Sequence, residues 1–532
     1  MKPWLLASVA VILGAGAAQA DYTLHVLHIN DFHSRIEPIS KLDSTCSAED
    51  EQKGACFGGV ARLAAQVKVL RDRLTADGQN VILLDAGDQY QGSLFYTTYK
   101  GKDTVEFMNL IGFDAMAVGN HEFDDGPAGL RVLAEGVKFP VISGNLDLSQ
   151  SPELKGKVGD TATLQVGGER IGIVSALAMD TPETSSPGDK VIFKDDLDSL
   201  RGDVQALTDA GVTKIIALTH EGYLRDQTIA AQVAGVDAVV GGHSHSLLGA
   251  MRGAEGPYPT MVKAADGAEV PVVSAYAYGK YLGHLVLTWN DAGQLIKAEG
   301  APILLDASVA PDPGVAARVK ELAAPIEALK QQRVAEIKAP INGDRKTCRQ
   351  RECEMGNVVT DAMLDRVRGQ GISIAIENGG GLRASLPAGP LTKGDVLSVL
   401  PFQNTLSTFR LSGADVVTAL ENGVSEYEQG AGRFAQVAGL KYTVDPAAAP
   451  GSRISGVQVR EGGAWVPIDP ARLYGVVSNN YMRRGGDGYA IMATGAKYAY
   501  DFGPDLADVL ADYLAGQGPD FVPVLDGRIT VR

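Results

Sequence analysis

Short apolar runs alternate with stretches of helical periodicity through much of the chain. The strand-like runs are residues 24–29, 81–84, 115–118, 171–175, 215–218 and 238–240. Apolar residues recur at helical spacing in 60–74, 104–111 and 197–210. Alternating strands and helices are typical of layered α/β folds. The pattern predicts such a domain over residues 21–310, without distinguishing one sheet from two.

A second pattern begins after residue 310. Residues 315–337 are rich in Ala, Glu, Lys and Leu, which are good helix formers, and Pro325 should kink or split the resulting helix. We therefore expect a connecting helix or hinge over 311–340. A second domain should follow over 341–532, with a helix near 357–368 and several strands and Gly-rich turns.

Residues 1–20 differ from the rest of the chain. Lys2 precedes an apolar run over 4–17, and an Ala-Gln-Ala motif ends at Ala20. This arrangement predicts a signal peptide cleaved after Ala20, because the run is short for a membrane span. An uncleaved anchor is the alternative. Since residues 526–532 are polar, no lipid-anchor signal follows, and we expect a periplasmic or secreted protein without a membrane anchor.

The charge balance limits the classes of molecule that the protein could bind. The 532 residues carry 48 basic and 64 acidic side chains, for a net charge of −16. Removing Lys2 with the signal peptide leaves 47 against 64, or −17. This acidity argues against a nucleic-acid polymer as partner, but it leaves room for a small phosphorylated substrate. The sequence does not indicate an oligomeric state.

Four cysteines are present, an even number that suggests disulfides in an exported protein. Of the three connectivities, proximity favours Cys46–Cys56 and Cys348–Cys353. Metal binding is the rival interpretation. Neither pair has the Cys-x-x-Cys spacing of zinc sites, so we prefer disulfides.

Polar motifs follow five of the strand-like runs, and they contain five of the eight histidines. They are Asn30-Asp31-Phe32-His33, Asp85-Ala86-Gly87-Asp88, Gly119-Asn120-His121-Glu122-Phe123-Asp124, Thr219-His220-Glu221 and Gly241-Gly242-His243-Ser244-His245. Ligands of α/β sheets gather at the carboxyl ends of the strands, so these side chains should converge. Asp, Asn and neutral His together suit zinc, manganese or related divalent ions.

Two of these motifs pair candidate ligands two residues apart: Asp31 with His33, and His243 with His245. In an extended segment both members of a pair would point to the same side. A single pair of this kind is more often incidental, but five motifs at strand ends together predict a metal site.

The motifs resemble those of the calcineurin-like metallophosphoesterases, and among them the secreted 5′-nucleotidase family, over nearly the whole mature chain. This resemblance implies a four-layer α/β metallophosphoesterase domain joined by a long helix to a second, α+β substrate-binding domain. It also implies two divalent ions, zinc first, with manganese or cobalt as alternatives. One ion would be held by Asp31, His33, Asp88 and His245, and the other by Asp88, Asn120, His220 and His243. His245 departs from the family, where an amide is usual.

The resemblance also implies catalytic residues. Two ions activate a water and clamp the phosphoryl oxygens for in-line displacement. His121 would stabilise the transferring phosphate or protonate the leaving oxygen, and Asp124 would orient the His121 ring. A helix N-cap is the alternative role for Asp124, and both roles are compatible.

Anion-binding features lie in the second domain. Arg349 falls inside the loop bracketed by cysteines, and the Gly-rich turn that starts at Asn378 ends in Arg383. Backbone amides and guanidinium groups together make anion sites, although most Gly-rich turns are structural. The resemblance implies that these three residues bind the ribose–phosphate part of a nucleotide.

Phe402 and Tyr481 are the candidate base-stacking residues. From spacing alone, core packing is the better interpretation of both rings. The family resemblance reverses this preference: the two rings would sandwich a nucleobase, and Asp487 would bind the ribose hydroxyls.

The sequence therefore indicates an exported, metal-dependent 5′-nucleotidase that hydrolyses nucleoside 5′-monophosphates such as AMP. A UDP-sugar or dinucleotide pyrophosphatase and a 2′,3′-cyclic nucleotide phosphodiesterase are the enzymatic alternatives. A catalytically silent nucleotide-binding protein would be expected to lack a ligand or His121, and none is missing.

Overall fold

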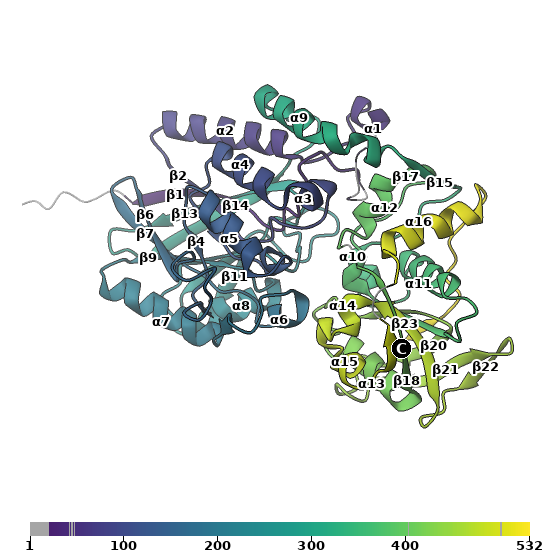
Figure 1. Cartoon of the computed structure of the whole chain (residues 1–532). Helices are drawn as coiled ribbons and strands as arrows, with labels where there is room; N and C mark the ends of the chain where they lie inside the picture. The colour runs from purple at the N-terminus through teal and green to yellow at the C-terminus, as the bar shows by residue number, and fades with distance from the viewer. Residues whose placement is uncertain (1–20, 42, 44–45, 47, 403, 501–502) are drawn as a thin grey trace, which may run out of the picture.

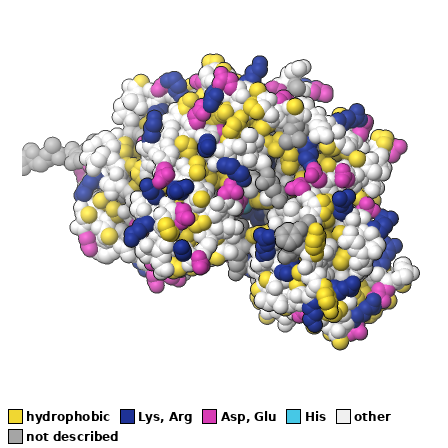
Figure 2. Space-filling model, viewed as in Figure 1, with side chains coloured by type: hydrophobic (Ala, Val, Ile, Leu, Met, Phe, Trp, Pro, Cys, Tyr) yellow, Lys and Arg dark blue, Asp and Glu magenta, His cyan; other side chains and the backbone are white. Residues whose placement is uncertain are grey.

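The computed structural model describes residues 21–532 except 42, 44–45, 47, 403 and 501–502. The expected signal peptide over 1–20 thus lies outside the described residues. The chain forms two lobes connected by a helix and a short strand (Figure 1). Basic and acidic side chains are interspersed over the viewed face of both lobes (Figure 2).

The first lobe contains two six-stranded sheets, which settles the question that periodicity left open. One has the order β14-β13-β1-β2-β3-β4, in which β1 to β4 are parallel, β13 pairs antiparallel with β1, and β14 pairs antiparallel with β13. Its strands are β1 (Tyr22–Ile29), β2 (Asn80–Asp85), β3 (Ala115–Ala117), β4 (Val141–Ile142), β13 (Tyr281–Trp289) and β14 (Leu295–Leu304). The expected strands at 24–29, 81–84 and 115–118 are confirmed to within two residues.

The second sheet has the order β11-β12-β10-β9-β7-β6. Its strands are β6 (Thr161–Val166), β7 (Glu169–Val174), β9 (Lys214–Thr219), β10 (Ala238–Gly241), β11 (Thr260–Lys263) and β12 (Glu269–Val273). A short pair, β5 (Leu146–Asp147) with β8 (Ile192–Phe193), lies apart from it. The four central strands, β12, β10, β9 and β7, are parallel, so their carboxyl ends lie at one edge.

Four layers result from burial of both faces of each sheet. Leu24 and Val26 of β1 belong to the core between the sheets, whereas Leu27 and Ile29 face the outer helices. Helices α2 (Val60–Ala76), α4 (Lys102–Ile111) and α5 (Pro127–Gly136) cover the first sheet, and α7 (Asp196–Asp209) and α8 (Tyr223–Gln232) cover the second. Shorter helices are α1 (Ala48–Gln52), α3 (Leu94–Tyr99), α6 (Thr181–Thr184) and η1 (Asn120–Phe123). The expected four-layer α/β architecture is confirmed.

The connector is shorter than the composition suggested. Helix α9 (Pro313–Lys330) contains Pro325 and packs on the first lobe through Val315, Leu322 and Ile326. Residues beyond it do not continue the helix but form β15 (Arg333–Ile337), which pairs with β17 (Gly389–Thr392) of the second lobe. The expected helical extent to 337 is therefore wrong at its end.

The second lobe is built on a five-stranded sheet of order β19-β16-β23-β18-β24. Its strands are β16 (Ile374–Asn378), β18 (Leu406–Ser412), β19 (Ala435–Ala438), β23 (Leu473–Asn479) and β24 (Lys497–Tyr500). A four-stranded sheet contains β20 (Leu440–Val444), β21 (Ile454–Glu461), β22 (Ala464–Pro467) and β25 (Ile529–Val531). This mixture of sheets and helices is the expected α+β domain.

Helices cover both faces of the five-stranded sheet. One face packs against α11 (Glu354–Arg366), α12 (Lys393–Val399) and α16 (Leu506–Gln517), and the other against α13 (Gly413–Gly423) and α15 (Ala490–Thr494). Short helices are α10 (Arg345–Cys348), α14 (Asn480–Arg483), η2 (Gly379–Gly381) and η3 (Gly486–Gly488). Both expected disulfides, Cys46–Cys56 and Cys348–Cys353, are formed. Within the described part of the chain, no helix has the length and apolar character needed to traverse a bilayer.

Candidate metal centre

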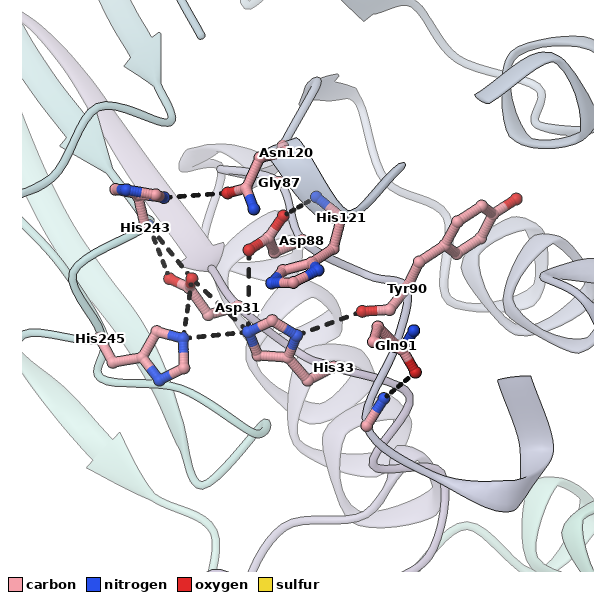
Figure 3. Close-up of polar contacts among 12 residues, drawn as sticks. Asp31, His33, Gly87, Asp88, Tyr90, Gln91, Asn120, His121, His243 and His245 are labelled. Atoms are coloured by element: carbon pink, nitrogen blue, oxygen red, sulfur yellow. Dashed lines mark hydrogen bonds and ion pairs between the residues drawn. The ribbon is translucent and has the colours of Figure 1, made fainter. Parts of the chain in front are cut away.

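Loops from both sheets of the first lobe meet at one edge, where they bring the candidate ligands together (Figure 3). Asp31 and His33 follow β1, Asp88 follows β2, Asn120 follows β3, His220 follows β9, and His243 and His245 follow β10. Backbone hydrogen bonds join the first two loops, since the amides of Asp31 and His33 donate to the carbonyls of Gly87 and Asp88 at 2.9 and 3.0 Å.

The loop backbone at these ligands is left-handed rather than extended. The φ angles of five candidate ligands are positive, at 51° for Asp31, 50° for His33, 61° for Asp88, 74° for His243 and 53° for His245. The expectation of extended Asp-x-His and His-x-His segments is therefore wrong. Such backbone is costly for residues other than glycine, and it persists where surrounding contacts impose it, often at functional sites.

One group of candidate ligands comprises Asp31, His33 and His245. The Nε2 atoms of the two histidines lie 3.0 Å apart, and His245 Nε2 lies 3.2 Å from Asp31 Oδ1 (Figure 3). His33 Nδ1 donates to the Tyr90 carbonyl at 3.2 Å, which fixes the ring with Nε2 toward the group. His245 therefore belongs to this group of candidate ligands, although the family resemblance implied an amide side chain at its position.

A second group comprises Asp88, His220, His243 and Asn120. His220 Nε2 lies 3.1 Å from Asp88 Oδ2, and His243 Nδ1 lies 2.9 Å from Asn120 Oδ1. The same Asp88 oxygen is 3.7 Å from His33 Nε2, so this carboxylate stands between the two groups. The structure brings all seven sequence-predicted metal ligands together.

The chemistry of this donor set fits divalent cations. Burial, reinforced by neighbouring cationic groups, lowers the pKa of His33, His243 and His245 well below the usual value and leaves neutral rings, the form that binds metals. His220 Nδ1 donates to the Ala86 carbonyl at 2.6 Å, which aims Nε2 at Asp88. Although burial alone would lower it, the Asp88 carboxylate raises the pKa of His220 to about 10, so this position favours a positive charge.

Glu122 is a supporting residue that the sequence analysis did not single out. Its fully buried carboxylate accepts hydrogen bonds from four backbone amides at 2.8 to 3.1 Å, those of Asp88, Gln89, Tyr90 and Gly119. This carboxylate ties the loop after β2 to the loop after β3. Its place in the Gly-Asn-His-Glu motif, next to candidate site residues, was the sequence feature that could have indicated this role.

His121 and Asp124 form a hydrogen-bonded pair beside this centre. His121 Nδ1 lies 2.7 Å from Asp124 Oδ2, and the His121 amide donates to Asp88 Oδ1 at 2.9 Å. Burial opposes protonation, but the Asp124 and Asp88 carboxylates outweigh it and raise the pKa of His121. The N-cap of α5 is Gly126, so the alternative role of Asp124 as a helix N-cap is wrong.

A cavity of about 850 Å³ opens between the lobes and reaches this centre. From the first lobe it is lined by Asp88, Asn120, His121, Asp124, His243 and His245. From the second it is lined by all six candidate substrate residues, Arg349, Asn378, Arg383, Phe402, Tyr481 and Asp487. Asp31, His33 and His220 are at most 1% exposed, consistent with ligands that lie behind the cavity wall.

Arginines of the second lobe reach the metal-ligand groups. Arg383 Nη2 donates to His33 Nε2 at 3.0 Å, and Arg345 Nη2 donates to the His243 carbonyl at 2.9 Å. Burial, together with repulsion from Arg383, lowers the pKa of both Arg345 and Arg349. The sequence analysis missed Arg345, whose signal was its position one helical turn before Arg349. Guanidinium groups gathered in this way suit a phosphate.

The nucleoside-binding candidates lie next to these arginines. Asp487 accepts hydrogen bonds from Asn378 Nδ2 at 2.7 Å and from the Tyr481 hydroxyl at 3.0 Å. The Phe402 ring stacks on His121 with centroids 5.7 Å apart, and Arg383 lies over its plane. Both aromatic rings are partly buried and line the cavity, and Tyr481 also packs against a core cluster of the second lobe.

Two family models cover most of the chain. Residues 24–247 match the calcineurin-like phosphoesterase model, and residues 333–494 match the 5′-nucleotidase C-terminal domain model. The fold and the ligand cluster thus define a metallophosphoesterase with a second, nucleotidase-type domain.

Individual proteins extend this likeness over the whole length. The chain is 37% identical to mouse 5′-nucleotidase, with 99% of this chain and 93% of that protein covered, and 37% identical to Naja atra snake venom 5′-nucleotidase, with 96% and 98% covered. A crystal structure of a 5′-nucleotidase precursor from Thermus thermophilus has a TM-score of 0.91 at 41% identity, covering 96% of this chain and 99% of that one. The chain belongs to the 5′-nucleotidase family and is a phosphoric monoester hydrolase.

Proposed function

We propose that this enzyme hydrolyses nucleoside 5′-monophosphates, such as AMP, to nucleoside and phosphate. The supporting observation is one cavity in which the metal-ligand groups and His121 adjoin Phe402, Tyr481 and Asp487. A phosphate placed at the ligand groups would have its nucleoside within reach of both rings. The relatives named 5′-nucleotidases support this substrate class.

The proposed cofactor is a pair of divalent ions, with zinc first and manganese or cobalt as alternatives. One ion would be held by Asp31, His33, Asp88 and His245, and the other by Asp88, Asn120, His220 and His243. Borderline ions suit the imidazole of His245, at a position where the family resemblance leads us to expect an amide. When bound, the ions would supply an activated water and offset the charge of the phosphoryl group.

The protein's own groups would complete the reaction. Arg345, Arg349 and Arg383 would hold the phosphoryl oxygens opposite the metal-ligand groups. His121 stacks on Phe402 and therefore lies on the side from which the nucleoside leaves. Its raised pKa favours a protonated ring, which would donate its proton to the leaving oxygen while Asp124 holds the ring in place.

Nucleoside recognition belongs to the second domain in this proposal, over residues 341–532, with 311–340 as the connector and 21–310 as the metallophosphoesterase domain. Phe402 and Tyr481 would stack the base and Asp487 would bind the ribose hydroxyls, while Asn378 orients Asp487. Export to the periplasm or medium fits the predicted signal peptide over 1–20 and the two disulfides.

The decisive experiment compares phosphate release from AMP, UDP-glucose, a dinucleotide and a 2′,3′-cyclic nucleotide, with metal analysis and a chelator control. We expect AMP to be the preferred substrate and the activity to depend on divalent metal. Inactivity on AMP with two metals bound would exclude the 5′-nucleotidase proposal. Faster cleavage of the sugar nucleotide, the dinucleotide or the cyclic nucleotide would favour the pyrophosphatase or the phosphodiesterase.

A further inference from the structure

The carboxylate of Asp124 is held at both of its oxygens. Oδ2 lies 2.7 Å from His121 Nδ1 and also accepts Gln91 Nε2 at 3.2 Å. Oδ1 accepts the hydroxyl of Ser185 at 2.8 Å. A carboxylate that orients a catalytic ring is effective only when its own rotamer is fixed, so these donors bear on the geometry of His121.

Ser185 comes from a different part of the fold than the loops that hold the metal-ligand groups. It is the C-terminal cap of α6, which lies against η3 of the second lobe. The same residue lines the cavity between the lobes. Its hydroxyl therefore links the His121–Asp124 pair to the wall next to Asp487, at the end of the cavity assigned to the nucleoside.

We propose that Ser185 is a positioning residue for protonation of the leaving group. The proposal rests on the proposed function. Water oxygen bonds to phosphorus as the P–O5′ bond breaks, and the electron pair of that bond passes to O5′. His121 Nε2 gives its proton to O5′, which leaves as the nucleoside alcohol, while the attacking water releases its proton to solvent. Solvent then reprotonates His121.

Loss of the Ser185 hydroxyl would leave Asp124 Oδ1 without this donor, so the carboxylate would be held at Oδ2 alone and its rotamer would be less restricted. The His121 ring would then spend less time aimed at the leaving oxygen. The resulting loss of rate should depend on how strongly departure of the leaving group requires protonation. A nucleoside alkoxide is a poor leaving group and must be protonated as it departs, whereas 4-nitrophenolate is stable enough to leave without a proton.

The test uses the full-length, metal-loaded enzyme and three variants: Ser185→Ala, Ser185→Thr and, as a matched control, Ser149→Ala. Ser149 is an exposed serine of the first lobe that also hydrogen-bonds to a carboxylate, that of Asp147, but it does not line the cavity. For AMP we expect Ser185→Ala to lower kcat about tenfold, the scale of one hydrogen bond to a charged group, with little change in KM. For 4-nitrophenyl phosphate the expected loss is less than about twofold. Ser185→Thr should recover most of the AMP rate, and Ser149→Ala should match the wild type.

Equal losses on AMP and 4-nitrophenyl phosphate would overturn the proposal, because they would indicate an effect on a step that both esters share. An unchanged AMP rate in Ser185→Ala would overturn it too. The proposal would also be overturned if Ser185→Thr lost as much of the AMP rate as Ser185→Ala while the two variants had equal Tm and metal content. A series of simple alkyl and aryl phosphates makes the same comparison without a nucleotide. Wild-type inactivity on AMP would therefore refute only the nucleotidase proposal, and the alkyl-to-aryl ratio would still decide the role of Ser185.

Discussion

At the scale of single residues, Asp88 has the position expected of a bridging ligand. Its Oδ2 atom faces His220 at 3.1 Å and His33 at 3.7 Å, one from each ligand group. Asp88→Asn keeps the shape and an acceptor for the His121 amide but removes the charge. We expect kcat/KM for AMP to fall at least about a hundredfold with the fold intact. Phosphate release and circular dichroism would measure this, and near-normal turnover would contradict the bridging role.

Phe402 lines the cavity and stacks on His121, and we propose that it binds the nucleobase. Phe402→Ala removes a face on which a base can stack, and base–aromatic stacking contributes about 1–3 kcal/mol. We therefore expect KM for AMP to rise about five- to hundredfold. The KM for a small aryl phosphate, which has no nucleobase, should not change. Parallel kinetics on both substrates check the assignment, and comparable losses on the two would mean that Phe402 acts through His121, on which it stacks.

At the scale of secondary-structure elements, the sequence was informative where burial decides structure. The strands β1, β2 and β9 are largely buried on both faces, so they appear as mainly apolar runs, interrupted in β1 by two histidines, with polar motifs at their ends. Their parallel arrangement then places the candidate ligands at one edge, which periodicity and chain order together predict.

Elements that depend on distant partners were not predictable in this way. β15 has helix-forming residues, yet its pairing with β17 outweighs that propensity, with Ala335 and Ile337 turned inward. The left-handed backbone at Asp31 and His33 is imposed by hydrogen bonds to the neighbouring loop. Arg345 contributes to the site only because the second lobe packs against His243, a contact that no local pattern encodes.

Strand β16 carries a buried acid whose ionisation should make stability depend on pH. Burial raises the pKa of Glu377 to about 8, although Asn479 donates to its Oε1 at 2.8 Å. An unfolded Glu titrates near pH 4.3, so the folded state holds an extra proton between about pH 4 and 8. The free energy of unfolding should therefore fall as pH rises through that window.

Glu377→Gln tests this directly, because an amide of the same shape cannot ionise. We expect the unfolding free energy of the variant to decline less than that of the wild type between pH 5 and 8, by an amount on the order of 2–4 kcal/mol. Urea denaturation at both pH values measures the difference. Parallel pH dependence in the two proteins would show that Glu377 ionises normally in the folded state.

At the scale of the whole molecule, the candidate site is shared between the lobes. Arg383 reaches His33, Arg345 reaches the His243 carbonyl, and Phe402 stacks on His121. The first lobe supplies the metal-ligand groups and the second supplies arginines and rings. Neither lobe alone would contain both the reacting centre and the surface that selects the substrate.

This division predicts unequal responses of the two lobes to metal removal. Burial raises the pKa of Asp31, and Asp31 and Asp88 lie in one buried cluster of the first lobe, where a bound cation would relieve their repulsion. Ligand binding to the folded state alone adds about 2.7 kcal/mol at a hundredfold excess over Kd. A chelator should therefore lower the Tm of the first-lobe transition by about 5–10 °C, and added zinc should restore it.

The second lobe provides the internal control for that experiment, because its core is separate and contains none of the proposed metal ligands. Differential scanning calorimetry with and without chelator should show its transition unmoved. Asp88→Asn, which lacks the carboxylate proposed to bridge the two ions, should show a smaller shift in the first-lobe transition than the wild type. An unchanged first-lobe transition in protein shown by metal analysis to be stripped would mean that the seven side chains do not bind cations tightly enough to stabilise the fold.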